Sequence, residues 1–131
     1  MSETVYAKDY MTRDVITFTA DMDIHLAIKV LVDKAISGAP VVNGSGNLVG
    51  ILSTRDCLKV AFATSYHKDH GGWVSDYMSK DVETIDAGTD MVEVADLFLK
   101  SRYRRFPVTT NNRLVGLISR YDVLRALGDL W

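Results

Sequence analysis

The sequence has a single cysteine, no long hydrophobic run and no excess of basic residues, and each absence excludes a class of protein. Cys57 has no partner for an internal disulfide, which favours a reducing, cytoplasmic compartment. No apolar run approaches the roughly 18 residues of a membrane span, and the start of the chain lacks the pattern of a secretory signal. The net charge of −2 is far from the basic balance of nucleic-acid-binding proteins. We therefore expect neither a membrane nor a nucleic acid as a partner.

The composition is that of an ordinary globular protein. Of the 131 residues, 47% are hydrophobic and 24% are charged, which argues against disorder and against low-complexity sequence. A chain of this size buries about two thirds of its unfolded surface, so it can form a core without a disulfide or a metal. The length suits one compact domain or two very small ones.

The dominant feature of the sequence is an internal repeat. The segment DYMTRDVITFTADMDI, which starts at Asp9, aligns without a gap with DYMSKDVETIDAGTDM, which starts at Asp76. Further along, LVGILSTRDCL at 48–58 matches LVGLISRYDVL at 114–124 after one residue is lost from a polar turn. Ordered matches of this length rarely arise by chance, so the chain is a tandem duplication. The expected parts are a first repeat at 1–65, a linker at 66–73 and a second repeat at 74–131.

Each repeat predicts the same order of elements, β-α-β-β-α. An extended stretch comes first, at 15–18 or 82–85, followed by a helix that Asp23 or Asp90 caps through its carboxylate. Gly38 and Pro40 are expected to end the first of these helices. Apolar strands follow at 40–43 and 48–53 and at 106–109 and 114–119, and the last helices run from Ser53 to near Thr64 and from Ser119 to near Leu127. The predicted fold class is α+β, with the two repeats packed in pseudo-twofold symmetry around a cleft.

This set of motifs resembles a tandem pair of cystathionine-beta-synthase (CBS) domains, also called a Bateman module. The duplication, the x-Pro-Val-x strand, the Leu-Val-Gly strand and the Ser-x-x-Asp at the start of the last helix carry the resemblance, each found twice. It covers the chain from about Ala7 to Leu127. It implies a stand-alone regulatory sensor, without a required cofactor, that binds AMP, ADP or ATP between the repeats and signals to an unidentified effector protein. The alternatives are S-adenosylmethionine or NAD as the ligand, or a structural interaction module with a vestigial cleft.

The resemblance assigns the ribose and phosphate contacts to the two Ser-x-x-Asp motifs, Ser53 with Asp56 and Ser119 with Asp122. A carboxylate can accept hydrogen bonds from both ribose hydroxyls, and a hydroxyl at a helix start lies beside N–H groups that favour anions. The alternative is that the serines are N-caps and the aspartates favour the helix dipole. Because both repeats keep Ser and Asp while the residues between them differ, we favour the ligand role.

The same resemblance places the adenine contacts on the first extended stretch and on the backbone just before the x-Pro strand. These positions are Val15, Thr17, Gly38 and Ala39 in the first repeat and Val82, Thr84, Arg105 and Phe106 in the second. Base readout by backbone groups needs no particular side chain. The two threonines are explained equally well as β-branched strand residues.

The repeats differ most just before the second x-Pro strand, where Arg104 and Arg105 stand in place of small uncharged residues. The resemblance implies that these two bind the phosphate of the nucleotide held by Asp56, a role that suits the planar guanidinium group. Arg55 and Arg120 are expected to add charge to the same cleft. The alternative is that the cations complement a helix dipole and a nearby acidic run. The ligand role predicts two unequal sites, of which the Asp56 site prefers phosphorylated ligands.

Other signals in the sequence are weaker. His67 and His70 form H-x-x-H in the linker, but this pair lacks further metal ligands, so no metal site is expected. Cys57 corresponds to Val123 in the second repeat, which indicates a packed residue and not a reactive thiol. No motif of nucleophilic, metal or nucleotide-hydrolysing catalysis occurs, so no enzyme activity is expected. The small size and the apolar last helices predict a homodimer.

Overall fold

The computed structural model describes residues 4–66 and 71–131, and this part of the chain forms two compact units. Met1–Val15 and Glu83–Trp131 make up unit 1, and Ile16–Val82 makes up unit 2. The two units therefore interleave along the sequence, because the N-terminal segment packs with the second half of the chain. The expected division of the repeats at 1–65, 66–73 and 74–131 describes the duplication and stays a prediction.

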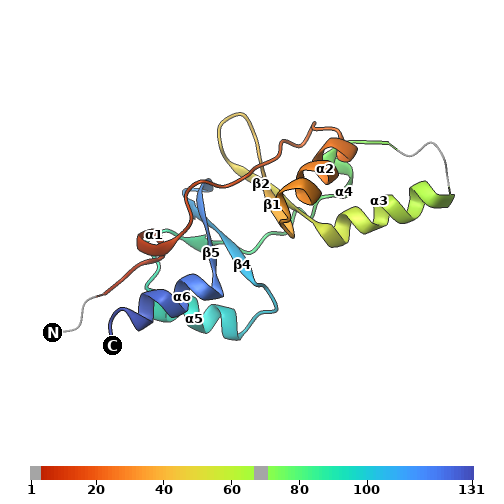
Figure 1. Ribbon diagram of the computed structural model, residues 1–131. Coiled ribbons are helices and arrows are strands. Elements are labelled where there is room, and N and C mark those ends of the chain that lie inside the picture. Colours follow the sequence, from red (N-terminus) through yellow and green to blue (C-terminus); the bar gives the residue numbers. More distant parts are fainter. Residues whose placement is uncertain (1–3, 67–70) are drawn as a thin grey trace. The chain divides into compact units, whose positions relative to one another are not determined.

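Unit 2 is built on a two-stranded antiparallel sheet in which Ala39 pairs with Leu52. Its elements are α2 (Ile24–Lys34), β1 (Gly38–Val42), β2 (Leu48–Ser53), α3 (Thr54–Tyr66) and α4 (Val74–Tyr77) (Figure 1). One face of the sheet and the buried sides of α2 and α3 enclose a core of aliphatic side chains with one aromatic ring. The core includes Phe18, Ile24, Leu31, Val41, Leu52, Val60 and Val74.

Unit 1 has the same plan with a three-stranded sheet of order β3-β4-β5, in which β3 is parallel to β4 and β4 is antiparallel to β5. Its elements are α1 (Ala7–Tyr10), β3 (Ile85–Asp86), α5 (Met91–Leu99), β4 (Arg105–Thr110), β5 (Arg113–Ser119) and α6 (Arg120–Gly128). Figure 1 shows α5 and α6 side by side. Their buried sides pack on the sheet around Met91, Val94, Phe98, Phe106, Val108, Ile118 and Ala126.

A short helix from the other half of the sequence completes each unit. After α1, Thr12 exchanges backbone hydrogen bonds of 2.8 and 2.9 Å with Leu117 of β5. After α4, Ser79 does the same with Ile51 of β2, at 2.9 Å in both directions. Ala7 of α1 and Val74 of α4 are fully buried in the cores of units 1 and 2. These helices are thus structural parts of the units into which they pack.

The capping signals in the sequence hold at both helix starts. The Asp23 carboxylate accepts hydrogen bonds from the N–H groups of His25 and Leu26 at 2.8 and 3.3 Å, and that of Asp90 accepts one from Val92 at 2.7 Å. Each satisfies first-turn donors that the helix itself leaves unpaired.

The predicted end of α2 is wrong. The helix stops at Lys34, because Ala35 adopts a left-handed conformation with φ of 54°. The N–H of Ile36 then donates to the Leu31 carbonyl at 3.1 Å, the closing bond of a Schellman motif, and the Ile36 side chain packs against the core. Gly38 therefore opens β1 instead of ending the helix.

The other predicted elements are present with shifted bounds. β2 matches its predicted range, while β1 and β4 begin earlier than expected. The first extended stretches are shorter: only Phe18 forms a bridge, to Val41, and only Ile85–Asp86 forms a strand, β3. The mixed α+β class with two matching repeats is confirmed.

Candidate functional site

The two Ser-x-x-Asp motifs form the same local structure at the starts of α3 and α6. In unit 2, Asp56 Oδ2 accepts hydrogen bonds from the backbone N–H and the hydroxyl of Ser53, both at 2.9 Å. The Asp56 N–H in turn donates to Ser53 Oγ at 3.1 Å. In unit 1, Ser119 and Asp122 repeat the three bonds at 2.8, 3.0 and 3.2 Å. Each motif is a reciprocal capping box. The predicted role of these residues at the helix start is therefore confirmed, and their ligand-binding role stays a prediction.

The capping box uses only one oxygen of each carboxylate. Asp56 and Asp122 are 7% and 8% exposed, and they are two of the three buried polar residues in the described chain. No described residue bonds to Asp56 Oδ1, yet no fully buried side-chain nitrogen or oxygen in the described chain lacks a partner. Oδ1 of Asp56 therefore keeps contact with solvent. It can accept hydrogen bonds from a bound molecule without disturbing the start of α3.

The second oxygen of Asp122 has a different environment. Arg125 Nη2 donates to Asp122 Oδ1 at 3.3 Å and to the backbone carbonyl of Tyr10 at 3.3 Å. The guanidinium lies 5.0 Å from the centre of the Tyr10 ring, and the Tyr10 hydroxyl donates to Asp129 Oδ2 at 2.7 Å. The hydrogen bond to Asp129, with some burial, raises the pKa of Tyr10 above its usual value.

Sequence reasoning did not include Tyr10 or Arg125 among the site residues. The spacing of Arg125 three positions after Asp122 was an available signal, because residues three apart are neighbours on a helix surface. The contact with Tyr10 carries no local signal, since 115 residues separate the two partners.

The sheet register brings the strand positions assigned to adenine next to the serines. Gly38 pairs with Ser53 across β1 and β2, and Arg105 pairs with Ser119 across β4 and β5. The strand before each helix thus runs directly beside the capping box. A Cβ on Gly38 would lie 3.0 Å from the Leu52 carbonyl oxygen, so the backbone approach at that point is close.

The remaining positions assigned to adenine differ in burial. Thr17 and Thr84 are exposed, and Val15, Gly38 and Val82 are half-buried. Ala39 and Phe106 are each 2% exposed, and the Phe106 ring packs 4.7 Å from that of Phe98. The side chain of Phe106 is therefore committed to the core, and only its backbone is free to face a ligand.

The four candidate phosphate-binding arginines, Arg55, Arg104, Arg105 and Arg120, are all exposed. Within the described residues, the ion pairs given by the structure are Lys100 with Asp96 at 2.7 Å and Arg125 with Asp122 at 3.3 Å. Arg104 is in neither of these two pairs. The Arg104 carbonyl accepts a hydrogen bond from the Arg120 N–H at 3.4 Å, which places the two residues at the same end of α6.

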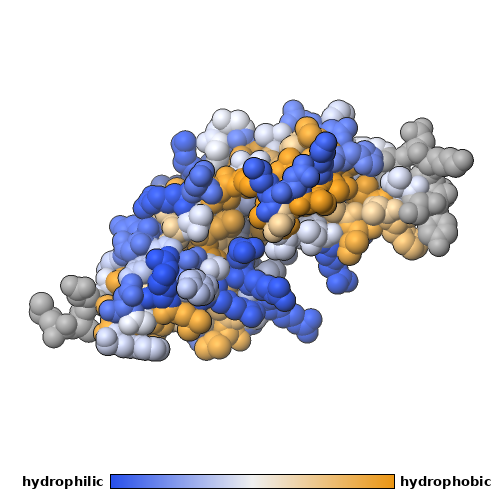
Figure 2. Space-filling view, in the orientation of Figure 1, coloured by the Kyte–Doolittle hydropathy of each residue, from blue (hydrophilic) through white to orange (hydrophobic). Residues whose placement is uncertain are grey.

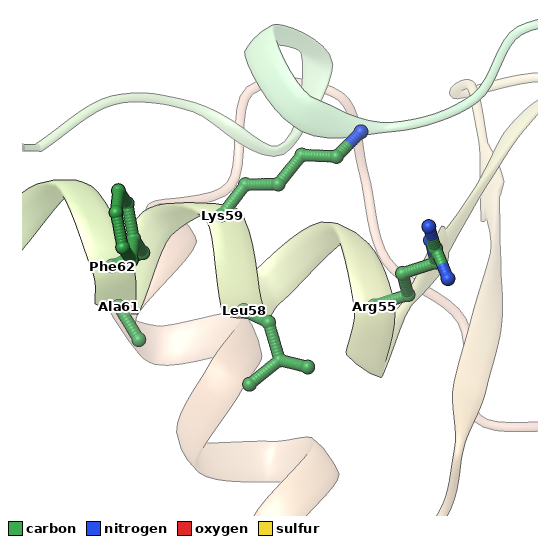
Figure 3. Close-up of a pocket in the computed structure, with 5 residues that line it drawn as sticks. All are labelled: Arg55, Leu58, Lys59, Ala61 and Phe62. Carbon is green, nitrogen blue, oxygen red and sulfur yellow. The ribbon is translucent and has the colours of Figure 1, made fainter.

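A surface hollow lies on α3, beside the Ser53 capping box along the helix. The described residues that line it all belong to α3 and combine two cations with apolar side chains: Arg55, Leu58, Lys59, Ala61 and Phe62 (Figure 3). Leu58 and Phe62 are 67% and 68% exposed, and Figure 2 shows apolar residues gathered over this helix. Among the candidate site residues, only Arg55 borders the hollow.

Three weaker signals have different outcomes. His67 and His70 lie outside the described residues, and in the described ranges 4–66 and 71–131 no three metal-ligating side chains cluster. Cys57 is buried in the core of unit 2, as its match to Val123 predicts. None of the described helices has the length and apolar character needed to cross a bilayer.

The comparisons with known proteins agree with the repeat and with the fold. The family model of the CBS domain matches residues 7–63 and 74–129. The uncharacterized protein MJ1225 of Methanocaldococcus jannaschii is 31% identical over 124 residues, which cover 95% of this chain and 43% of MJ1225. The chain thus spans less than half the length of that relative.

Two solved structures extend the comparison to three dimensions. The CBS-pair protein CBSX2 of Arabidopsis thaliana, solved in complex with AMP, superposes with a TM-score of 0.81 at 28% identity, over 95% of this chain and 96% of that one. The CBS domain pair of protein MJ0100, in complex with 5-methylthioadenosine and S-adenosyl-L-methionine, has a TM-score of 0.76 at 26% identity, over 97% and 98% of the two chains.

Proposed function

The chain belongs to the CBS domain family, and from that premise we propose that it is a regulatory module that binds an adenosine-containing ligand and signals to a partner protein. The observation that carries the proposal is the solvent-accessible oxygen of Asp56. It belongs to a buried carboxylate whose other oxygen is fully used by Ser53. Charge-assisted hydrogen bonds from ribose hydroxyls match such an acceptor.

The ligands of the related structures support this choice. AMP, 5-methylthioadenosine and S-adenosyl-L-methionine differ in charge and in the 5′ substituent, but all contain adenine and a ribose with two hydroxyls. The shared chemistry is therefore the nucleoside. In this proposal the backbone next to Ser53 and Ser119, at Gly38 and Arg105, reads the base.

We further propose that the regulatory ligand is a nucleotide, AMP, ADP or ATP. Arg105 at the start of β4 and Arg104 just before it supply the positive charge that a phosphate requires. Arg120 directly follows Ser119, and Arg55 lies two residues after Ser53. Arginine suits phosphate because its donors form a planar fork. Arg104→Ala is expected to lower AMP affinity and leave adenosine affinity unchanged in calorimetry. Equal losses for both ligands would contradict the phosphate assignment.

Thermal unfolding with and without ligand tests the proposed function. A ligand at 100 times its dissociation constant adds about 2.7 kcal/mol of stability. Adenosine and AMP are expected to raise the melting temperature, whereas 2′,3′-dideoxyadenosine, which lacks both ribose hydroxyls, is the matched control and is expected to have little effect. No shift with adenosine, AMP or S-adenosylmethionine at millimolar concentration would contradict ligand sensing and favour an interaction module.

The protein is also proposed to be a cytoplasmic homodimer. Large apolar side chains lie exposed on α3 and α6, among them Leu58, Phe62, Tyr121 and Leu124, which are 65–72% exposed. A closed twofold contact between copies is the commonest way to cover such faces. Light scattering is expected to give about twice 14.6 kDa. The monomer mass at micromolar concentration would contradict the dimer.

A further inference from the structure

Asp56 and Asp122 differ in the groups that face Oδ1, the carboxylate oxygen that takes no part in the capping box. In unit 1 that oxygen, Asp122 Oδ1, accepts a hydrogen bond from Arg125 at 3.3 Å. Tyr10 holds Arg125 in place, since its carbonyl accepts from the same guanidinium nitrogen and its ring lies under the guanidinium at 5.0 Å. Tyr10 is fixed in turn by its hydroxyl bond to Asp129. A chain of three side chains therefore positions a cation on Asp122.

Unit 2 lacks this arrangement. The repeat alignment places Lys59 where the second repeat has Arg125, and Ala63 where it has Asp129. Within the described residues, no ion pair or hydrogen bond joins Lys59 to Asp56. In Figure 3, the Lys59 side chain extends to the opposite side of α3 from Leu58. Ala63 has no side-chain oxygen, and the hydroxyl of Tyr77, the repeat counterpart of Tyr10, donates to the Gly71 carbonyl at 3.4 Å. The free oxygen of Asp56 is therefore left to the solvent.

We propose that Arg125 is a positioning residue that makes Asp122 the weaker ribose acceptor of the two, so that the first ligand binds at Asp56. This assignment rests on the proposed function. A ribose hydroxyl that approaches Asp122 must displace the Arg125 guanidinium or share its acceptor, whereas at Asp56 it replaces only water. The pair is half-exposed on the arginine side, where the Arg125 side chain is 48% accessible against 12% for Asp122. Removing an ion pair with this degree of exposure is expected to change the affinity of the Asp122 site for a ribose about 1.5- to 5-fold.

Calorimetry with adenosine tests the assignment, because adenosine has the ribose hydroxyls but no phosphate for the arginines of β4. Asp56→Asn leaves Asp122 as the remaining carboxylate. In that background, Arg125→Met is expected to raise adenosine affinity about 1.5- to 5-fold. In the Asp122→Asn background the same Arg125→Met change is expected to leave affinity unchanged, which a general loss of structure would not do. Lys59→Met, the repeat counterpart, is the matched control and should have no effect in either background.

The outcomes separate this assignment from the proposed function. If the wild-type protein binds adenosine but Arg125→Met leaves the Asp122 site unchanged or weakens it, Arg125 does not restrain Asp122 and the assignment is wrong. Arg125→Lys gives unit 1 the residue that unit 2 carries and is expected to raise affinity as Arg125→Met does, since Lys59, at the same position in the described part of unit 2, makes no ion pair with Asp56. If the wild-type protein binds neither adenosine nor AMP, the proposed function itself fails, and this assignment fails with it.

Discussion

The two oxygens of Asp56 have different partners, and this difference separates a structural role from a binding role within one residue. Oδ2 accepts from the N–H and the hydroxyl of Ser53, and Oδ1 meets no described residue. A substitution that keeps one acceptor in the place of Oδ2 can therefore remove the binding role and retain the cap. The CBS aspartate is thus both a helix cap and a candidate ribose acceptor.

In the Asp122→Asn background, where Asp56 is the remaining carboxylate, Asp56→Asn is expected to weaken adenosine and AMP binding about 10- to 150-fold, because charge-assisted hydrogen bonds contribute about 1.5–3 kcal/mol. The melting temperature of the ligand-free protein should barely change, since the amide oxygen can take the place of Oδ2. Asp56→Ala, the control that also removes Oδ2 and so the carboxylate half of the capping box, should lower the free energy of unfolding by about 1 kcal/mol. Calorimetry and thermal unfolding measure both effects. Unchanged affinity in Asp56→Asn together with lower apo stability would mean that Asp56 is only a cap.

The raised pKa of the buried Cys57 thiol predicts that the folded protein loses stability at alkaline pH. Burial, and to a smaller extent the neighbouring Asp56 carboxylate, raise the pKa of the Cys57 thiol above its ordinary value of 9.0. The unfolded chain therefore releases this proton at lower pH than the folded protein does. The contribution is fully present below the unfolded pKa and is lost as pH rises above it through the higher pKa of the folded state. Cys57→Val, which copies the second repeat, should remove this pH dependence in urea unfolding; an identical decline in both proteins would refute it.

At the scale of elements, the short helices α1 and α4 are held by glycines in the strands on which they pack. The segment after α1 bridges to β5 beside Gly116, and the segment after α4 bridges to β2 beside Gly50. A Cβ on Gly116 would lie 2.7 Å from the Thr12 carbonyl oxygen, and one on Gly50 would lie 2.9 Å from that of Ser79. Both contacts are with backbone oxygens that are themselves in strand-like hydrogen bonds, so neither can move away easily.

Gly50→Ala and Gly116→Ala are each expected to lower the free energy of unfolding by about 1–3 kcal/mol, the usual cost of overpacking. Gly44→Ala is the matched control, because a Cβ there meets no atom within 4 Å and its backbone is not left-handed. Urea unfolding measures the difference. A fall of the same size in Gly44→Ala, or none in the other two variants, would show that the glycines are not needed for the close approach.

At the scale of the whole molecule, each compact unit needs residues from both repeats. Unit 2 buries Val74, which lies in the second repeat, and unit 1 buries Ala7, which lies in the first. A cut at the boundary of the repeats would remove one of these helices from its core. The compact unit of this chain is therefore not the sequence repeat.

A fragment that spans 16–82 is expected to unfold cooperatively, with low stability because a unit of this size buries little surface. A fragment that spans 1–66 should show no cooperative transition, since it lacks α4 and carries α1 without its sheet. Circular dichroism during thermal unfolding compares the two. A cooperative transition in 1–66 as sharp as that in 16–82 would contradict the dependence on the exchanged helices.

The sequence alone determined the duplication, the type of most elements and the helix caps. Asp23, Asp90 and Ser119 all accept hydrogen bonds from residues two or three positions ahead. Such signals are legible in sequence because both partners lie within one turn. The motif Ser-x-x-Asp is also short, so the sequence predicts its hydrogen bonds at the helix start. Its ligand-binding role depends on which groups face the remaining carboxylate oxygen, and the motif itself does not indicate that.

Tertiary structure alone decided the features that join distant residues. Tyr10 lies 115 positions from Arg125 and 119 from Asp129, and no periodicity or spacing relates them. The exchange of α1 and α4 likewise depends on which strand edge each segment meets, and the left-handed turn at Ala35 depends on the core position of Ile36. Contacts of this kind depend on how whole surfaces pack, and many side chains contribute together to the free energy of that packing. No short segment of sequence therefore predicts them.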